Sequence, residues 1–315
     1  MLYGGAVMRI FVTGASGWIG SGVVPELLGA GHEVVGLARS EASSKQLEEA
    51  GAIVQRGDLD DPDGLAKAAA DSDGVIHLAF QHEEAFSGNF AAAAAVDRRA
   101  VEAMGAALAD SDRPLVLASG LLGLNVGRVA TEDDGLVPTA EVRAIPAGLR
   151  AATALFTLSL RGTGVRSVVL RFPPTVHGDG DHGFMAILVG VARAKGEVGY
   201  VGDGKNRWPA VHRSDAARLA RLAVEAAPAG SVLHAVAEEG VPFVEIAKTM
   251  GGRLGLPAAS VAPADALEHF SHLGLLVGLD SPASSAITRE LLGWAPMGPG
   301  LIEDLEQDHY YRSET

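Results

Sequence analysis

The stretch that decides the fold is Met8-Arg-Ile-Phe-Val-Thr13, followed directly by Gly14-Ala-Ser-Gly-Trp-Ile-Gly20. Its first part is a short apolar run rich in β-forming residues, which is typical of a buried strand. The run from Ser21 to Ala30 then predicts a helix that Gly31 ends. Three glycines spaced by three residues therefore lie between a strand and the free amides of a helix N-terminus.

Each of these glycines has a separate physical role. Gly14 allows a tight turn, Gly17 lets the backbone approach a pyrophosphate, and Gly20 lets the helix pack closely on the strand. The helix N-terminus adds a partial positive charge that favours phosphate. The sequence thus predicts a dinucleotide-binding turn, and a purely structural tight turn is the alternative.

The end of the next predicted strand, Glu33 to Ala38, indicates which dinucleotide is bound. In NAD-binding folds an acidic residue about 20 residues after the glycines holds the ribose 2′-hydroxyl. Here Ala38 stands at that point, and Arg39 and Ser40 follow it. A guanidinium and a hydroxyl suit a 2′-phosphate, so we predict NADP in preference to NAD. The alternative is that Arg39 is an ordinary surface residue.

The composition of the 315 residues excludes several other classes of protein. A formal net charge of −14 disfavours nucleic acid as a partner, and the absence of cysteine excludes disulfides and thiolate metal sites. No apolar run approaches the roughly 20 residues that span a bilayer, and the first seven residues lack the pattern of a secretory signal. We expect a cytoplasmic protein with a large buried core and no membrane partner.

Strand-like runs alternate with helical stretches along the first half of the chain, which predicts an α/β fold with a doubly wound parallel sheet of the Rossmann type. Past Thr175 the order becomes irregular. We therefore predict a dinucleotide-binding domain over residues 1–175, with return elements at about 205–237, and a smaller substrate-binding lobe over residues 176–315.

The order of the motifs resembles that of the extended short-chain dehydrogenases/reductases, the NAD(P)-dependent epimerase/dehydratase family, over almost the whole chain. The matching segments are Thr13 to Gly20, Gly57-Asp-Leu59, Asp73-Gly-Val-Ile-His-Leu-Ala79, Leu115-Val-Leu-Ala-Ser119, Val168 to Val176, Trp208 to Asp215 and Leu291-Leu-Gly-Trp-Ala-Pro296.

Together with Arg39 and Ser40, the residues that this resemblance implies for the cofactor form one set. It comprises Thr13, Gly14, Ser16, Gly17, Trp18, Ile19 and Gly20 at the glycine turn, Asp58 and Leu59 at the adenine, and Leu78, Ala79, Phe80, Pro173 and Thr175 along the remaining strand ends. The resemblance also puts Asp97 where the family often has Asn. By analogy, it implies a homodimer formed through the fourth and fifth helices.

The sequence departs from the family at its proton relay, which uses a Tyr and a Lys four residues later. No such pair follows any of the four tyrosines, Tyr3, Tyr200, Tyr310 and Tyr311. The family's usual element lengths place Pro146 near the Tyr position and Arg150 near the Lys position. Proline has no proton to give, whereas Arg150 can hold a ribose hydroxyl but is a poor acid or base.

Ser119, His177 and Arg150 are the predicted catalytic residues. Ser119 can bond a substrate carbonyl, although a strand-end serine in a turn is the alternative. His177 takes the place of a Tyr-Gly in the family's loop after the sixth strand, and an imidazole suits a proton donor. Asp179 or Asp181 is expected to set its tautomer. We predict no metal here, and a polar loop closing over the cofactor is the other alternative.

Three functions fit these observations. The one we favour is an NADP-dependent oxidoreductase that acts on a small carbonyl or alcohol substrate. The others are a nucleotide-sugar epimerase or dehydratase with bound NAD(P), and a non-catalytic NADP-binding sensor. The turn Gly202 to Arg207 carries two cations that could reach an anionic group, or it is a solvated hairpin tip.

Overall fold

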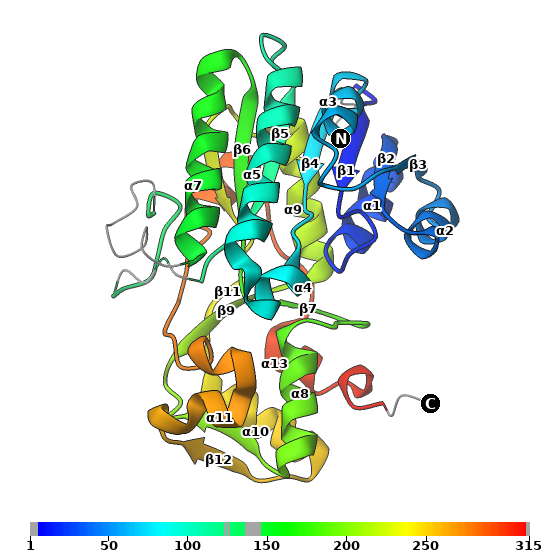
Figure 1. Cartoon of the computed structure of the whole chain (residues 1–315). Helices are drawn as coiled ribbons and strands as arrows, with labels where there is room; N and C mark the ends of the chain where they lie inside the picture. The colour runs from blue at the N-terminus through cyan, green and yellow to red at the C-terminus, as the bar shows by residue number, and fades with distance from the viewer. Residues whose placement is uncertain (1–5, 123, 125–126, 136–145, 313–315) are drawn as a thin grey trace.

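Seven parallel strands form the central sheet, and a second lobe lies beyond one end of it (Figure 1). The computed structural model of the chain describes residues 6–122, 124, 127–135 and 146–312. The sheet has the order β10-β6-β5-β4-β1-β2-β3. Its strands are β1 (Arg9–Thr13), β2 (Glu33–Ala38), β3 (Ile53–Arg56), β4 (Gly74–His77), β5 (Pro114–Gly120), β6 (Arg166–Phe172) and β10 (Ser231–His234).

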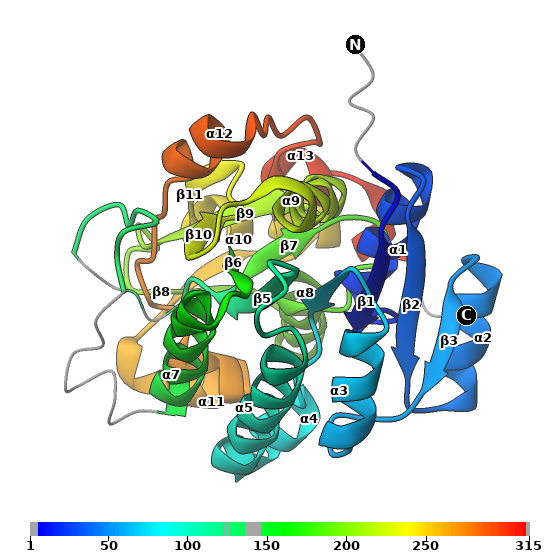
Figure 2. The same ribbon diagram turned by 90° about the horizontal axis from the view of Figure 1, so that it is seen from above.

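The strand order reverses between β1 and β4, which is the doubly wound pattern predicted from the sequence. The two halves of the sheet are covered by helices on both faces (Figure 2). One face carries α1 (Gly20–Gly29), α2 (Glu41–Glu49) and α9 (Arg213–Ala226), and the other carries α3 (Pro62–Ala70), α5 (Phe90–Ala107) and α7 (Pro146–Ser159).

Alternation along the strands divides the core between these two faces. Ile10 and Val12 of β1 pack with α1 and α9, whereas Phe11 between them packs with α3 and α5. All three side chains are fully buried. A strand covered on both faces is apolar throughout, which explains the continuous apolar run that identified β1.

The second lobe has its own apolar core, which contains Trp208, Phe243 and Phe270. A three-stranded sheet of order β11-β9-β7 and a two-stranded sheet of order β12-β8 frame it. Its strands are β7 (Thr175–His177), β8 (Val198–Val201), β9 (Arg207–His212), β11 (Glu238–Pro242) and β12 (Ala258–Val261). Its helices are α8 (Phe184–Lys195), α10 (Phe243–Leu254), α11 (Ala266–Phe270) and α13 (Leu301–Leu305).

Short helices complete the described chain. They are α4 (His82–Glu84), η1 (Ala85–Asn89), η2 (Leu160–Thr163), η3 (Pro263–Asp265), η4 (Ser271–Leu275), α12 (Ala286–Leu292) and η5 (Asp308–Tyr310). Within the described ranges, none of the helices combines the length and apolar character that crossing a membrane requires.

The segment Val168 to Val176, which resembles the sixth strand of the family and the loop after it, joins the two lobes. Strand β6 ends at Phe172, and the short strand β7 begins at Thr175 in the second lobe. Pro173 and Pro174 cause the break, because proline cannot donate to a strand ladder. After β9 the chain returns to the central layer as α9 and β10. The division into domains at residue 175 stays a prediction.

Candidate active site

The glycine turn between β1 and α1 has the geometry that a dinucleotide needs. Gly14 has φ +66°, and a Cβ placed there would lie 2.7 Å from the Ala79 nitrogen. A Cβ on Gly20 would lie 2.1 Å from the Gly14 carbonyl oxygen, and Gly17 is exposed. Among the described residues, no side chain caps α1. The amides of Ser21, Gly22 and Val23 donate to backbone carbonyls, but among the described residues those of Trp18, Ile19 and Gly20 do not. These three amides are thus available to phosphate, so the turn fits NAD or NADP.

Two guanidinium groups lie at the end of β2, where the sequence predicts a 2′-phosphate. Arg39 is exposed and forms no hydrogen bond or ion pair within the described part of the chain. Arg56, which no sequence motif marks, lies opposite Ala38 in the β2–β3 register. It donates to Ser44 Oγ at 2.6 Å and forms an ion pair with Glu41 at 3.4 Å. Ser40 caps α2 by accepting the Ser43 amide at 3.1 Å.

The other predicted cofactor residues follow the carboxyl edge of the sheet. Leu78, Ala79 and Phe80 lie half-buried just past β4, and Ala79 donates its amide to Thr13 Oγ1 at 3.3 Å. Asp58 is exposed and Leu59 is buried after β3. Thr175, in contrast, donates its hydroxyl to the Pro209 carbonyl. Contact of this set with a cofactor stays a prediction.

Ser119, Arg150 and Phe80 meet at this edge from three different elements. Ser119 lies half-buried near the end of β5. Arg150 of α7 donates to the carbonyl of Ala118, the residue before Ser119, at 3.0 Å. Its guanidinium carbon also lies 4.1 Å from the centre of the Phe80 ring. The guanidinium is thus held in place between the end of β5 and Phe80, one of the predicted cofactor residues.

A buried polar chain leads from the glycine turn toward Arg150. Thr13 Oγ1 lies 2.6 Å from His77 Nδ1, and His77 Nε2 lies 3.2 Å from Asp97 Oδ1. Among the described residues, Asp97 Oδ2 is buried without a hydrogen-bond partner. Burial lowers the pKa of Arg150, and the charge of Asp97 opposes this effect. Asp97 therefore supplies negative charge behind the guanidinium.

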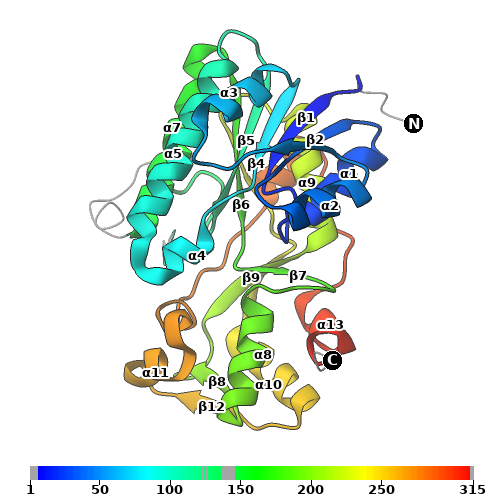
Figure 3. The same cartoon turned by 45° about the vertical axis from the view of Figure 1, so that its right-hand side comes forward.

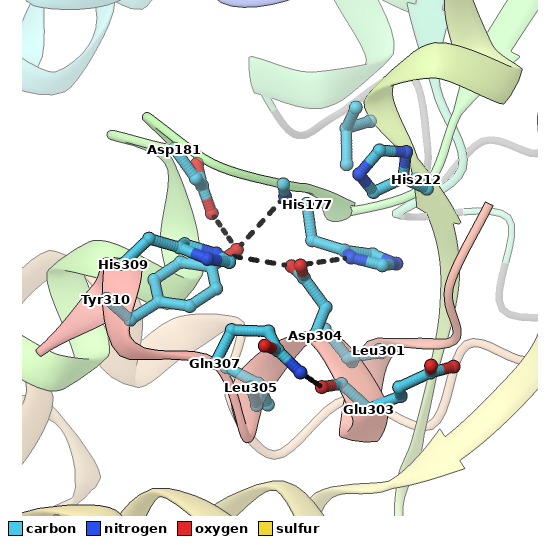
Figure 4. A network of polar contacts seen from close by, with 12 residues as sticks. His177, Asp181, His212, Leu301, Glu303, Asp304, Leu305, Gln307, His309 and Tyr310 are labelled. Atoms are coloured by element: carbon cyan, nitrogen blue, oxygen red, sulfur yellow. Dashed lines mark hydrogen bonds and ion pairs between the residues drawn. The ribbon is translucent and has the colours of Figure 1, made fainter.

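His177 lies in the second lobe and joins two of its elements. Figure 4 shows its ring beside Asp304 of α13, with Nδ1 2.9 Å from Asp304 Oδ2. The prediction that Asp179 or Asp181 sets the tautomer of His177 is therefore wrong. Asp179 is exposed, and Asp181 instead accepts the hydroxyl proton of Tyr310 at 3.0 Å. His177 lies in β7 and points toward α13, whereas both aspartates belong to the loop that follows β7.

The Asp304 carboxylate is the acidic centre of a group of histidines. Burial raises its pKa, but the hydrogen bond from His177 and the charges of His177, His309 and His212 outweigh burial and bring the pKa below its usual value. His177 itself has no exposed surface. Its assignment as a proton donor stays a prediction, and the geometry supports a role in holding β7 to α13.

Replacing Asp304 by Asn is expected to lower the free energy of unfolding by about 1–3 kcal/mol, because the buried His177 loses a charged partner. The difference between the variants is greatest above the ordinary carboxyl pKa, near 3.8, and shrinks as the pH falls through the lowered pKa of Asp304. Urea denaturation at several pH values measures it. Asp179→Asn, on the exposed loop, is the matched control. Equal stability of both variants would contradict this link.

Comparison with known proteins places this arrangement in a family. The model of the NAD dependent epimerase/dehydratase family matches residues 10–235. The chain belongs to that family. The family is NAD-dependent by its description, so an NAD-type dinucleotide is its cofactor.

Several known proteins resemble most or nearly all of the chain. An uncharacterized protein of Schizosaccharomyces pombe is 46% identical over 306 residues, covering 96% of this chain and 100% of that protein. The 2-alkyl-3-oxoalkanoate reductase of Stenotrophomonas maltophilia is 28% identical, covering 81% and 78%. The structure of dTDP-glucose 4,6-dehydratase from Streptomyces venezuelae, with NAD bound, matches at TM-score 0.75 and 21% identity over 95% of both chains. This last likeness shows the fold alone.

Proposed function

We propose that the protein is an NADP-dependent oxidoreductase that reduces a small uncharged carbonyl compound or oxidises the corresponding alcohol. The observation that carries the choice of NADP is the unpaired, exposed guanidinium of Arg39 after β2, with Arg56 beside it across the β2–β3 register. An exposed cation without a protein partner suits a phosphate, whereas NAD-specific folds place an acid there.

The residues at the carboxyl edge are proposed to bind the substrate carbonyl and to hold the cofactor. When bound, the dinucleotide supplies or takes the hydride. Ser119 is proposed to donate its hydroxyl to the carbonyl oxygen of the substrate. Arg150, fixed by the Ala118 carbonyl and the Phe80 ring, is proposed to hold a ribose hydroxyl in place of the family's Lys. His177 is proposed to support the site through Asp304.

The charged residues of the turn after β8 favour an uncharged substrate. Lys205 lies 2.9 Å from Asp203, and Arg207 donates to Asp280 at 2.7–3.0 Å through its amide and guanidinium. Both cations that the sequence offered for an anionic group are thus neutralised by carboxylates. A nucleotide diphosphate would have to displace these pairs, so a nucleotide-sugar substrate is less favoured. A homodimer and a cytoplasmic location stay predictions.

A panel of uncharged aldehydes and ketones, mixed with the protein and NADPH, tests this function. We expect at least one of them to be reduced, seen as falling NADPH absorbance, with NADH giving a slower reaction at equal concentration. Conversion of a nucleotide sugar without net NADPH consumption would instead establish an epimerase. Tight NADPH binding without turnover of any compound would favour the sensor.

A further inference from the structure

His82 lies directly after the predicted cofactor residues Leu78, Ala79 and Phe80 that follow β4. It begins α4, two residues after Phe80, and its ring meets the Phe80 ring edge-on with the centroids 5.1 Å apart. The residue is exposed as a whole. Figures 1 and 3 show α4 at the end of α5 that faces the second lobe. An exposed histidine therefore stands beside the carboxyl edge of the sheet.

Phe80 connects His82 to the other residues of the candidate site. The Arg150 guanidinium lies over the Phe80 ring at 4.1 Å, and its hydrogen bond to the Ala118 carbonyl brings it next to Ser119. These residues come from three segments of the chain: Phe80 and His82 follow β4, Ser119 lies in β5 and Arg150 lies in α7. No single sequence motif therefore identifies the group. What the residues of the group share is their place at the edge of the sheet where the parallel strands end.

Charged groups from two helices act on the His82 ring. Packing around the ring lowers its pKa below 6.5, and so does the charge of Arg150 from α7. A backbone hydrogen bond at Phe80 and the charge of Asp97 from α5 act in the opposite direction. On its own short helix, Glu83 and Glu84 follow, and Gln81 before it donates to Asp60 at 3.1 Å. His82 is thus mainly neutral near pH 7.

Four other side chains that could carry a proton are placed less well to serve as the acid or base of carbonyl reduction. His177 is fully buried against Asp304, and His77 is fully buried between Thr13 and Asp97. Tyr200 lies in β8, and Tyr310 of η5 packs in the same second-lobe core. Burial and the charge of Asp181 raise the pKa of Tyr310, which removes it further from acid–base work near neutral pH.

We propose that His82 is the general acid and base of the reaction, in place of the tyrosine that the family uses. This inference rests on the proposed function. In reduction, a hydride adds to the carbonyl carbon, and the protonated imidazole gives its proton to the carbonyl oxygen, leaving the alcohol and neutral His82. Solvent then reprotonates the exposed ring. In oxidation, neutral His82 takes the hydroxyl proton as the hydride leaves the carbon.

This assignment fixes the direction of the pH dependence. Carbonyl reduction needs the protonated ring, so its rate rises as the pH falls toward the lowered pKa of His82. Alcohol oxidation needs the neutral ring, so its rate persists through neutral pH and falls only in acid.

Steady-state kinetics of His82→Gln tests the proposal, with His272→Gln on the exposed η4 as the matched control. Loss of a general acid costs roughly 10²–10⁴ in kcat. We expect His82→Gln to lose this factor and the pH dependence while it binds NADPH with the affinity of the unmodified protein. His82→Ala should regain part of its rate when imidazole is added, because the site is open to solvent.

A second measurement does not depend on turnover. NMR titration of the His82 ring in the whole protein should give a pKa below 6.5, and Arg150→Met should raise that pKa because it removes the nearby positive charge. A His82 pKa that does not respond to Arg150→Met would overturn the assignment of this pair to one site.

The outcomes separate the two proposals. An unmodified protein that reduces no carbonyl compound overturns the proposed function, and the role of His82 falls with it. An active protein in which His82→Gln keeps its full rate and pH profile overturns the role of His82 alone. Loss of the pH dependence in folded His177→Gln, with His82→Gln unaffected, would identify His177 as the donor instead.

Discussion

Replacing Gly20 by Ala is expected to abolish tight dinucleotide binding and to destabilise the fold. The added Cβ would lie 2.1 Å from the Gly14 carbonyl oxygen and 2.7 Å from backbone carbons of Ala15. These are backbone atoms of the turn itself, so relief requires α1 to move away from β1. Overpacking of this kind costs about 3 kcal/mol. Displacement of the phosphate-binding amides by about 1 Å should weaken NADPH binding on the order of 100-fold.

Gly29→Ala, at the other end of the same helix, is the matched control. A Cβ at Gly29 meets nothing within 4 Å, so this variant should be as stable as the parent or more stable by up to about 1 kcal/mol. Thermal denaturation and NADPH fluorescence titration measure both effects. If Gly20→Ala bound NADPH as tightly as Gly29→Ala does, the glycine turn would not be the phosphate site.

Arg39→Ala is expected to raise the dissociation constant of NADPH about 10- to 100-fold and to leave that of NADH unchanged. The guanidinium has no described protein partner to lose, so the variant should keep its stability. Hydrogen bonds between charged groups contribute about 1.5–3 kcal/mol, which is the source of the expected factor. Because the site is exposed, the preference for NADPH should also weaken at high salt.

The control for Arg39 is Lys67→Gln, an exposed cation on α3 across the opposite face of the sheet. It removes one positive charge, as Arg39→Ala does, but should not change either affinity. Competition titrations with NADPH and NADH distinguish the variants. Parallel weakening of both cofactors in Arg39→Ala would mean that Arg39 contacts something other than the 2′-phosphate. Tighter binding of NADH by the unmodified protein would remove the NADP assignment.

Local patterns in the sequence were enough for the fold and the glycine turn. The strand from Glu33 to Ala38 has the predicted bounds, because its apolar run, its turn residues and its parallel partners all act over short distances. The central sheet follows from the same alternation. The end of β6 before Pro173 and Pro174 also follows from a local pattern, since two prolines cannot continue a sheet ladder.

Contacts between distant segments set the rest of the site. Asp304 lies 127 residues from His177, so the nearer Asp179 and Asp181 were the natural choice. His82 and Arg56 were missed for a related reason. Neither residue belongs to a sequence motif. His82 is identified only by its contact with Phe80, and Arg56 only by its position opposite Ala38. The sequence shows which side chains could act as acids, bases or ligands. It does not show which distant residues will contact them and change their pKa.

The ion pair between His177 and Asp304 also bears on the order in which the protein folds. Every strand of the central sheet precedes residue 235, so a growing chain can complete that sheet before α13 has been synthesised. The contact that fixes β7 closes a loop of more than a hundred residues, and contacts of this sequence separation form late and slowly. The dinucleotide-binding half can thus fold first, and nascent chains can bind cofactor before the contact between β7 and α13 has formed.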